Sequence, residues 1–233
     1  MRGSRISIAS YNVHAWNGMD RSYNPRRIIQ VLDELKADVI ALQEACFPEN
    51  EAFSRLMQDI TKTTGLELIA GPTFCRNGEN FGNVLLTRYP VSRLRRLDLS
   101  VRSREPRGAL DVDLDVNGTI LRVVATHLGL RASERRAQVD ILLESLSIGH
   151  VQYTVVMGDF NIWSPLSPAK HRLTKRLGKG PTLATYPTMF PLFALDRIFV
   201  RPKKILKEFT VHKSVTAKIA SDHLPIKAVL ELG

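Results

Sequence analysis

The sequence has little cysteine and no long apolar run. Its two cysteines, Cys46 and Cys75, stand far apart and form no C-x-x-C pair, so they indicate neither a thiolate metal site nor a disulfide framework. The longest apolar stretches, such as residues 39–42, are far shorter than the roughly 20 residues that a membrane-spanning helix needs. The first residues are basic but lack the apolar region of a secretory signal. We therefore expect a cytoplasmic protein without a transmembrane segment.

Acidic residues are in the minority. The sequence has 33 Lys and Arg against 23 Asp and Glu, which gives a formal net charge of +10 at pH 7. A positive field of this size attracts polyanions, including nucleic acids, anionic lipid surfaces and phosphorylated small molecules. A basic surface that only keeps the protein soluble would give the same count. Nothing in the sequence indicates an obligate protein partner, and we expect a monomer.

No tandem repeat, low-complexity tract or Gly/Ser-rich linker divides the sequence, and we expect one domain over residues 1–233. Strand–helix–strand units alternate with hairpins, which predicts an α/β fold with mixed sheets and helices on their outer faces. The long irregular stretch over residues 162–185 resembles an active-site or substrate loop that contains a short basic helix.

Periodicity and turn residues locate the elements. Asn24-Pro25 provides an N-cap and a proline at the first helical position, and Asn117-Gly118 provides a tight hairpin turn. Apolar residues at helical spacing after Pro25 are Ile28, Val31, Leu32 and Leu35. We expect further helices over residues 50–64 and around 139–146, and strands over residues 5–11, 38–43, 82–87, 91–99, 110–116, 119–126, 154–157, 195–200, 205–211 and 225–230, with one more beginning near Leu66.

Three aspartates alternate with apolar residues in the expected strand over residues 110–116. Strict alternation predicts a half-buried strand, with Asp111, Asp113 and Asp115 on a solvated face. The same string begins like a calcium-binding loop, but Val116 stands where that loop needs Gly and Arg122 where it needs Glu. The sequence therefore predicts no calcium site here.

Short polar clusters lie at the ends of several expected strands. α/β proteins present functional groups at a sheet edge in this way. Each cluster alone has a simpler explanation, such as a hydrogen-bonded histidine, a helix cap or a turn, but their occurrence together indicates a site. The clusters are Tyr11-Asn12-Val13-His14, Gln43-Glu44, Thr126-His127, Gly158-Asp159-Phe160-Asn161, Asp196 and Ser221-Asp222-His223.

In this order the clusters resemble the endonuclease/exonuclease/phosphatase superfamily, which includes apurinic endonucleases, pancreatic-type deoxyribonucleases, neutral sphingomyelinases and inositol polyphosphate phosphatases. The likeness spans about residues 6–230. Its most specific parts are Gly158-Asp159-Phe160-Asn161 and residues 221–225, supported by residues 42–44 and 195–198. The resemblance implies a four-layer α-β-β-α sandwich and a small bacterial member of the superfamily that hydrolyses phosphate esters with a divalent cation.

The resemblance also implies roles for individual residues. Glu44, with Asn12 and Asp222 nearby, would bind Mg²⁺ or Mn²⁺, and oxygen ligands suit such hard cations. Asp159 would take a proton from the attacking water, and Asn161 would orient that water or a phosphate oxygen. His223, oriented by Asp196, would face the scissile phosphate and His127 would contact another phosphoryl oxygen. Further residues expected to bind substrate phosphate are His14, Asn83, Arg107 and Arg131.

Several basic residues have two possible explanations. Arg107 and Arg131 would bind phosphate bidentately or belong to the ordinary charged surface, whereas Arg135 is expected to be structural. Residues 170–179 carry six basic side chains that form either a solvated helix face, which we favour, or a contact with a polyanion backbone. We expect Leu166, Leu173 and Leu177 to anchor this segment; its basic residues are Lys170, His171, Arg172, Lys175, Arg176 and Lys179.

The substrate is left open between two phosphate-ester classes. The basic charge favours DNA or RNA, whereas short loops favour a phospholipid or a small phosphorylated molecule. Apurinic endonucleases carry a tyrosine–asparagine segment where this sequence has residues 129–132, and an acidic residue in place of His14, which disfavours abasic-site cleavage. A non-catalytic polyanion-binding module is a further alternative, but it would not be expected to retain Glu44, Asp159 and His223.

Overall fold

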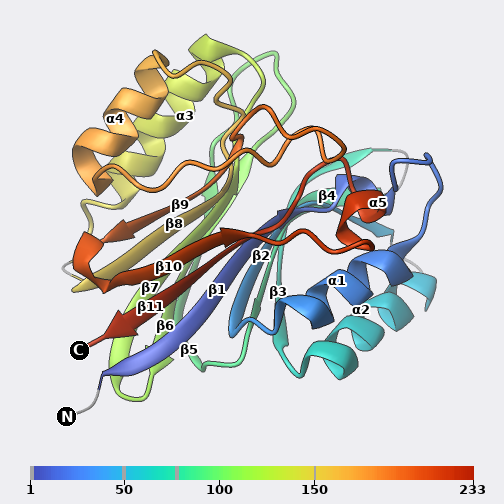
Figure 1. Cartoon of the computed structure of the whole chain (residues 1–233). Coiled ribbons are helices and arrows are strands. Elements are labelled where there is room, and N and C mark those ends of the chain that lie inside the picture. Colours follow the sequence, from blue (N-terminus) through green and yellow to red (C-terminus); the bar gives the residue numbers. More distant parts are fainter. Residues whose placement is uncertain (1–2, 49–50, 77–78, 150) are drawn as a thin grey trace.

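Two mixed sheets packed face to face form the centre of the computed structural model, which describes residues 3–48, 51–76, 79–149 and 151–233 (Figure 1). The first sheet has the strand order β10 (Leu206–Val211), β11 (Ile226–Leu232), β1 (Ser4–Asn12), β2 (Val39–Pro48), β4 (Glu79–Thr87) and β3 (Glu67–Arg76). The second has the order β5 (Val91–Asp98), β6 (Gly108–Val116), β7 (Thr119–His127), β8 (Tyr153–Asp159) and β9 (Asp196–Arg201).

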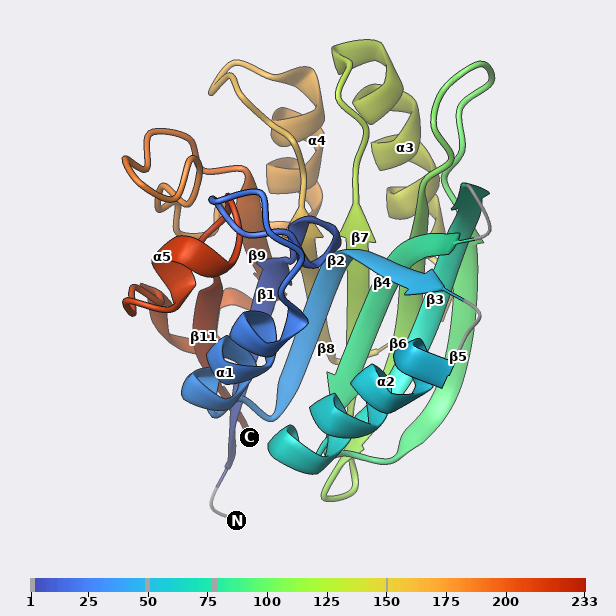
Figure 2. The same cartoon turned by 90° about the vertical axis from the view of Figure 1, so that its right-hand side faces the viewer.

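Helices cover the outer faces of both sheets and complete four layers. α1 (Pro25–Leu35) and α2 (Glu51–Thr64) lie over the first sheet, and α3 (Ala132–Ser145) and α4 (Pro168–Leu177) lie over the second (Figure 2). The short elements η1 (His14–Trp16), η2 (Lys203–Ile205) and α5 (Ala217–Ala220) lie in connections. Within the described residues, no helix is both long enough and apolar enough to span a membrane. The expected four-layer α-β-β-α fold is confirmed.

Each sheet contains one parallel strand pair, and these pairs position the site. β1 pairs in parallel with β2, and β7 pairs in parallel with β8. A parallel pair needs a crossover connection, and α1 and α3 provide these crossovers. The apolar residues predicted for α1, from Ile28 to Leu35, are buried against the first sheet. Parallel neighbours end at the same edge, so each pair brings two polar strand ends together.

Asp111 and Asp113 correct the prediction of a solvated strand face. Both are buried, and Asp111 is only 1% exposed. Arg122 on the neighbouring strand donates to both carboxylate oxygens of Asp111, at 2.8 and 2.6 Å, and Arg95 pairs with the same carboxylate. Alternation predicted correctly which side chains share a face, because Leu110, Val112 and Leu114 pack between the sheets. It could not predict that arginines would cover the opposite face.

Two further expectations are wrong in detail. Leu166 is 89% exposed, so that of the three expected anchors of α4 only Leu173 and Leu177 are buried. Asn24 precedes α1 as predicted, but its side chain makes no capping hydrogen bond. The hairpin at Asn117-Gly118 is confirmed, since both residues have positive φ, 53° and 84°. The predicted start of the second helix at residue 50 lies outside the described residues.

We predict that Asp111→Asn lowers the free energy of unfolding by about 3 kcal/mol, because it leaves the buried guanidinium of Arg122 without a compensating charge. Chemical denaturation monitored by circular dichroism measures the change. The control Asp59→Asn removes an exposed carboxylate from α2 and is expected to change stability by less than about 0.5 kcal/mol. Equal effects of the two substitutions would contradict the prediction.

Candidate active site

An irregularity in β2 turns Glu44 away from the sheet. The pairing between β2 and β4 shifts register between Leu42 and Ala45, and Glu44 has a φ of 54°. A bulge of this kind re-aims a side chain that regular pleating would place in the core. The Glu44 side chain remains 36% exposed, whereas Leu42 and Ala45 on either side of the bulge are buried. The backbone therefore directs this carboxylate into a cavity.

The end of β8 is shaped by a glycine. Gly158 has a φ of 147°, and a Cβ atom at this position would lie 1.8 Å from the backbone oxygen of Thr126 on β7. Only glycine allows the two strands to approach so closely. Asp159 follows as the last residue of β8, and its Oδ1 accepts a hydrogen bond of 2.8 Å from the backbone N–H of Asn161. The chain thus fixes the Asp159 carboxylate at the sheet edge.

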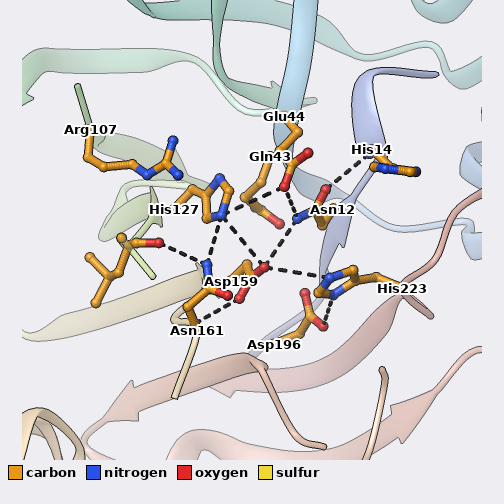
Figure 3. A network of polar contacts seen from close by, with 12 residues as sticks. Asn12, His14, Gln43, Glu44, Arg107, His127, Asp159, Asn161, Asp196 and His223 are labelled. Carbon is orange, nitrogen blue, oxygen red and sulfur yellow. Dashed lines mark hydrogen bonds and ion pairs between the residues drawn. The ribbon is translucent and has the colours of Figure 1, made fainter. Parts of the chain in front are cut away.

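Asn12, the last residue of β1, joins the two sheets. Its Nδ2 donates to Glu44 Oε1 at 2.9 Å and to Asp159 Oδ2 at 3.1 Å (Figure 3). Its Oδ1 accepts from the backbone N–H of His14 at 3.0 Å. The amide therefore holds two carboxylates from different sheets at neighbouring positions and lessens the repulsion between them.

His223 has its ring oriented by a buried carboxylate. Nδ1 of His223 lies 2.8 Å from Oδ2 of Asp196, which also accepts a hydrogen bond of 2.6 Å from Oγ1 of Thr185. The other ring nitrogen, Nε2, lies 3.7 Å from Oδ2 of Asp159. Burial opposes a charge on His223, but the charge and hydrogen bond of Asp196, with Asp159 and Asp222, outweigh it and raise the pKa of His223 to about 10. The ring is thus held as an imidazolium.

His127 is the opposite case. Burial, together with the positive charges of Arg107 and His223, holds the pKa of His127 well below its ordinary value. Asn161 Nδ2 lies 3.0 Å from His127 Nε2 and also donates to the backbone oxygen of Leu128 at 2.9 Å. In a neutral ring, Nε2 therefore accepts from Asn161 and the proton lies on Nδ1. One histidine is charged and the other is neutral.

Asp159 lies between these groups. Its Oδ2 is 3.7 Å from the Nε2 atoms of both His127 and His223. Burial is the main reason that the pKa of Asp159 rises to about 6, and Asp196 raises it further, while His223 and the hydrogen bonds from Asn161 and Asn12 oppose the rise. A carboxylate with a pKa near neutrality is suited to accepting a proton.

A cavity of about 450 Å³ opens above these side chains. Arg107 lies on its wall, where it is paired with Glu105. Asn83 donates to the backbone oxygen of Gly108 at 3.0 Å, and its buried Oδ1 has no hydrogen-bond partner in the described part of the chain. Of the expected site residues, those that line this cavity are His14, Glu44, Asn83, Arg107, His127, Asp159, Asn161, Asp222 and His223.

Three expected site residues do not line the cavity. Asn12 and Asp196 lie directly behind it, each hydrogen-bonded to a residue that does. Arg131 lies apart from it: it is exposed at the N-cap of α3, where its backbone contacts Glu134 and Arg135. Its position therefore gives no support to a phosphate-binding role. Arg135 is structural as expected, because it donates to the backbone oxygens of Gly129 and Leu130.

Comparison with known proteins decides the family. The model of the Endonuclease/Exonuclease/phosphatase family matches residues 9–223. The chain belongs to this family.

Members of the family are hydrolases that act on phosphate esters and generally depend on a divalent metal. The chain is 28% identical to the uncharacterized protein YbhP of Escherichia coli K12, in an alignment that covers 97% of this chain and 96% of YbhP. An endonuclease/exonuclease/phosphatase structure from Beutenbergia cavernae superposes with a TM-score of 0.77 at 22% identity, covering 100% of this chain and 72% of that one. The mannosyl-6-phosphatase Bt3783 of Bacteroides thetaiotaomicron superposes with a TM-score of 0.73 at 19% identity, covering 98% of this chain and 100% of that one.

The donor set of this family member fits a hard divalent cation. Glu44 and Asp222 present carboxylate oxygens to the cavity, and the two cysteines of the sequence contribute nothing to it. Asp159, Asp196 and His223 form a second group, with ligand atoms within 4.8 Å of one another. That group fits a cation less well, because Asp196 Oδ2 already accepts hydrogen bonds from Thr185 and His223, and the His223 ring is held as a cation.

Several residues around the site were not predicted from the sequence, among them Trp163, Thr185 and Tyr186. Trp163 and Tyr186 line the cavity, and the Tyr186 ring lies 4.9 Å from the His223 ring. Thr185, which donates to Asp196, is fully buried. All three lie in or next to the stretch over residues 162–185 that the sequence indicated as an active-site loop. Its irregular pattern contains no signal that distinguishes one such residue from its neighbours.

We predict that Asp196→Asn lowers the pKa of His223 from about 10 toward its ordinary value of 6.5. The substitution removes the charge of Asp196, which is the largest of the influences that oppose the effect of burial on this pKa. Titration of the imidazole nitrogens by NMR in the metal-free protein measures it. Glu34→Gln is the matched control, since Glu34 Oε2 pairs with His212 at 2.9 Å elsewhere in the fold. The assignment fails if His223 still titrates near 10 in Asp196→Asn.

Proposed function

We propose that this protein is a divalent-cation-dependent hydrolase of phosphate esters, and of phosphodiesters in particular. The observation that carries the proposal is the position of Asp159. This buried carboxylate lies within 4 Å of both histidine rings and is bridged by Asn12 to the cavity-facing carboxylate of Glu44. A proton acceptor, an imidazolium and oxygen donors for a cation thus surround one point in the cavity.

Glu44, with Asn12 and Asp222 beside it, would hold Mg²⁺ or Mn²⁺. When bound, the cation would neutralise charge on the phosphoryl oxygens and on the leaving oxygen. Asn12 orients Glu44 through its amide, and Ser221 Oγ donates to the backbone oxygen of Asn12 at 2.7 Å, which ties this strand end to the Asp222 segment. The phosphate would enter the cavity against these groups, with Arg107, Asn83 and His14 at its wall.

Asp159 would accept the proton of the attacking water as the new oxygen–phosphorus bond forms and the bond to the leaving oxygen breaks. Its raised pKa lets it hold that proton near neutral pH. His223 would donate a hydrogen bond from Nε2 to a phosphoryl oxygen, where negative charge concentrates, while Asp196 holds the ring at Nδ1. His127 and Asn161 support each other beside Asp159. Both side-chain contacts of Asn161 are made by Nδ2, so its Oδ1 remains to accept a hydrogen bond from water.

We predict hydrolysis of bis(p-nitrophenyl) phosphate with Mg²⁺ or Mn²⁺, and a loss of about 10²- to 10⁴-fold in kcat for Asp159→Asn, because the proton acceptor is removed. Release of p-nitrophenol measures turnover. Asp59→Asn, which removes an exposed carboxylate on α2, serves as the matched control. No turnover by wild type with either cation, or equal rates for wild type and Asp159→Asn, would contradict the proposal.

The physiological substrate divides the proposal into two versions. The net charge of +10 supports DNA or RNA, whose phosphates attract a basic protein without regard to sequence. The fold of mannosyl-6-phosphatase Bt3783 supports a small phosphate ester instead. Plasmid DNA, a single-stranded oligonucleotide, phospholipid vesicles and a small phosphomonoester, each assayed with wild type and Asp159→Asn, separate the versions. The retained carboxylates and histidines speak against a non-catalytic module.

A phospholipid substrate is favoured by apolar side chains around the cavity. Trp163 and Leu130 line the cavity yet stay 41% and 65% exposed. The loop after Tyr186 carries Phe190 at 76% and Leu192 at 74% exposure, and Trp163 contacts Phe193 of this loop with ring centroids 4.9 Å apart. Exposed apolar groups next to one another typically mark a contact surface, and a lipid headgroup region would cover them.

We predict that Phe190→Ser reduces hydrolysis of phospholipid vesicles at least about fivefold, through weaker surface binding, and leaves turnover of bis(p-nitrophenyl) phosphate unchanged. Ile148→Ser, at another exposed apolar position after α3, is the control. Equal vesicle hydrolysis by wild type and Phe190→Ser would remove the support for this version. A parallel loss on the soluble diester would show that the loop acts on the site itself.

A further inference from the structure

Arg197 on β9 is a buried arginine outside the catalytic cavity. Side chains alternate along this strand: Ile198 packs between the sheets, whereas Phe199 packs in the cluster beneath α3 and α4. Arg197 shares the face of Phe199, and Asp196 shares that of Ile198. Arg197 therefore points away from the active site, toward the segment that follows α4, and is only 6% exposed.

The charge of Arg197 has no carboxylate partner among the described residues. Its Nη1 donates to Oγ1 of Thr182 over 3.3 Å, and its Nε is buried with no hydrogen-bond partner within residues 3–48, 51–76, 79–149 and 151–233. Asp196 is adjacent in sequence but faces the other side of the strand. Burial lowers the pKa of Arg197, as expected for a charge taken out of water, and the charge of Asp196 opposes this effect without forming an ion pair with Arg197. Buried charges in folded proteins are normally paired, so this guanidinium lacks an anion.

Two lysines face the same place. Lys170 of α4 and Lys179, which follows the helix, line a small recess together with Arg197 and Thr182. Neither lysine forms an ion pair among the described contacts. Burial lowers the pKa of Lys170, and the charges of Arg197 and Lys179 lower it further. Three like charges thus gather where repulsion would separate them, unless an anion lies between them.

We infer that this recess is a binding site for a phosphate-class oxyanion. Arg197 offers a planar fork that matches a tetrahedral oxyanion, Lys170 and Lys179 add charge, and the Thr182 hydroxyl adds a donor. Three cations favour a dianion such as phosphate over a carboxylate. The recess shares no lining residue with the catalytic cavity, so anion binding here does not depend on the function proposed for that cavity.

The size of the recess limits the ligand. Its volume of about 20 Å³ is close to the space that one water molecule needs, so it admits one edge of a phosphate group and the rest of the group would lie at its mouth. A groove of about 580 Å³ along α4 shares Lys170, Thr174 and Lys179 with it and also includes His171. The bound group is therefore either free inorganic phosphate or the phosphate of a small ester whose remainder lies in the groove. Both sources present the same chemistry to Arg197.

Calorimetric titration of the metal-free protein with inorganic phosphate, at constant ionic strength, tests the site. Wild type is expected to bind phosphate, and Lys170→Gln to weaken binding about tenfold, since a charge-assisted contact is lost. Lys175→Gln removes an equal charge from the exposed face of α4 outside both hollows, and Arg107→Gln removes one from the catalytic cavity. Lys175→Gln is expected to stay within about twofold of wild type, and Arg107→Gln reports separately on phosphate held in the catalytic cavity.

Arg197→Met supplies an independent readout. Because it removes a buried unpaired charge, its melting temperature without phosphate is expected to match or exceed that of wild type, and phosphate is expected no longer to raise it. Glycerol phosphate distinguishes the sources. If glycerol phosphate binds more tightly than inorganic phosphate, and His171→Ala removes this difference, the site is one for a phosphate ester. If the two bind equally, the site is one for free phosphate.

Three results would overturn the inference. Equal weakening in Lys170→Gln and Lys175→Gln would mean that diffuse charge alone attracts phosphate. Loss in Arg107→Gln but not in Lys170→Gln would mean that phosphate binds only in the catalytic cavity. A destabilised Arg197→Met whose melting temperature still rises with phosphate would mean that this arginine is only structural.

Discussion

One side-chain amide connects the two halves of the candidate active site. Asn12 Nδ2 donates to Glu44 from the first sheet and to Asp159 from the second, at 2.9 and 3.1 Å. Two carboxylates this close would otherwise repel each other. The contact forms only if β1 and β8 end at the same level when the sheets pack, so the geometry of the site depends on the register of both sheets. A single group thereby couples the fold to the chemistry.

Electrostatic differences within the cavity follow from burial and partner charge. His223 and His127 are both buried, but only His223 has a carboxylate at hydrogen-bond distance, and its pKa rises while that of His127 falls. Asp159 lies between them and is itself raised by burial. One fold thus supplies a cationic ring, a neutral ring and a proton acceptor within a few ångströms. Such a division of protonation states is typical of hydrolytic sites.

Much of this arrangement could be predicted from the sequence. Apolar periodicity located α1 and the core face of β6, and polar residues at strand ends indicated where Asp159 and His223 would meet. The predictions that were wrong concern side chains whose surroundings are formed by residues distant in sequence. The aspartates of β6 are buried because Arg122 and Arg95 reach them from adjacent strands, and strand alternation contains no information about such partners. For the same reason the sequence could not distinguish Arg107 from Arg131, although Arg107 lines the cavity and Arg131 lies apart from it.

We propose that residues from the first to the last strand converge on one site for a hard cation, with Glu44 as its main ligand. Titration of Mn²⁺ into wild type and Glu44→Gln by calorimetry tests it most directly, with circular dichroism to establish that both are folded. We predict that cation affinity falls at least about tenfold in the variant while the fold persists. Unchanged affinity in a folded Glu44→Gln protein would contradict it.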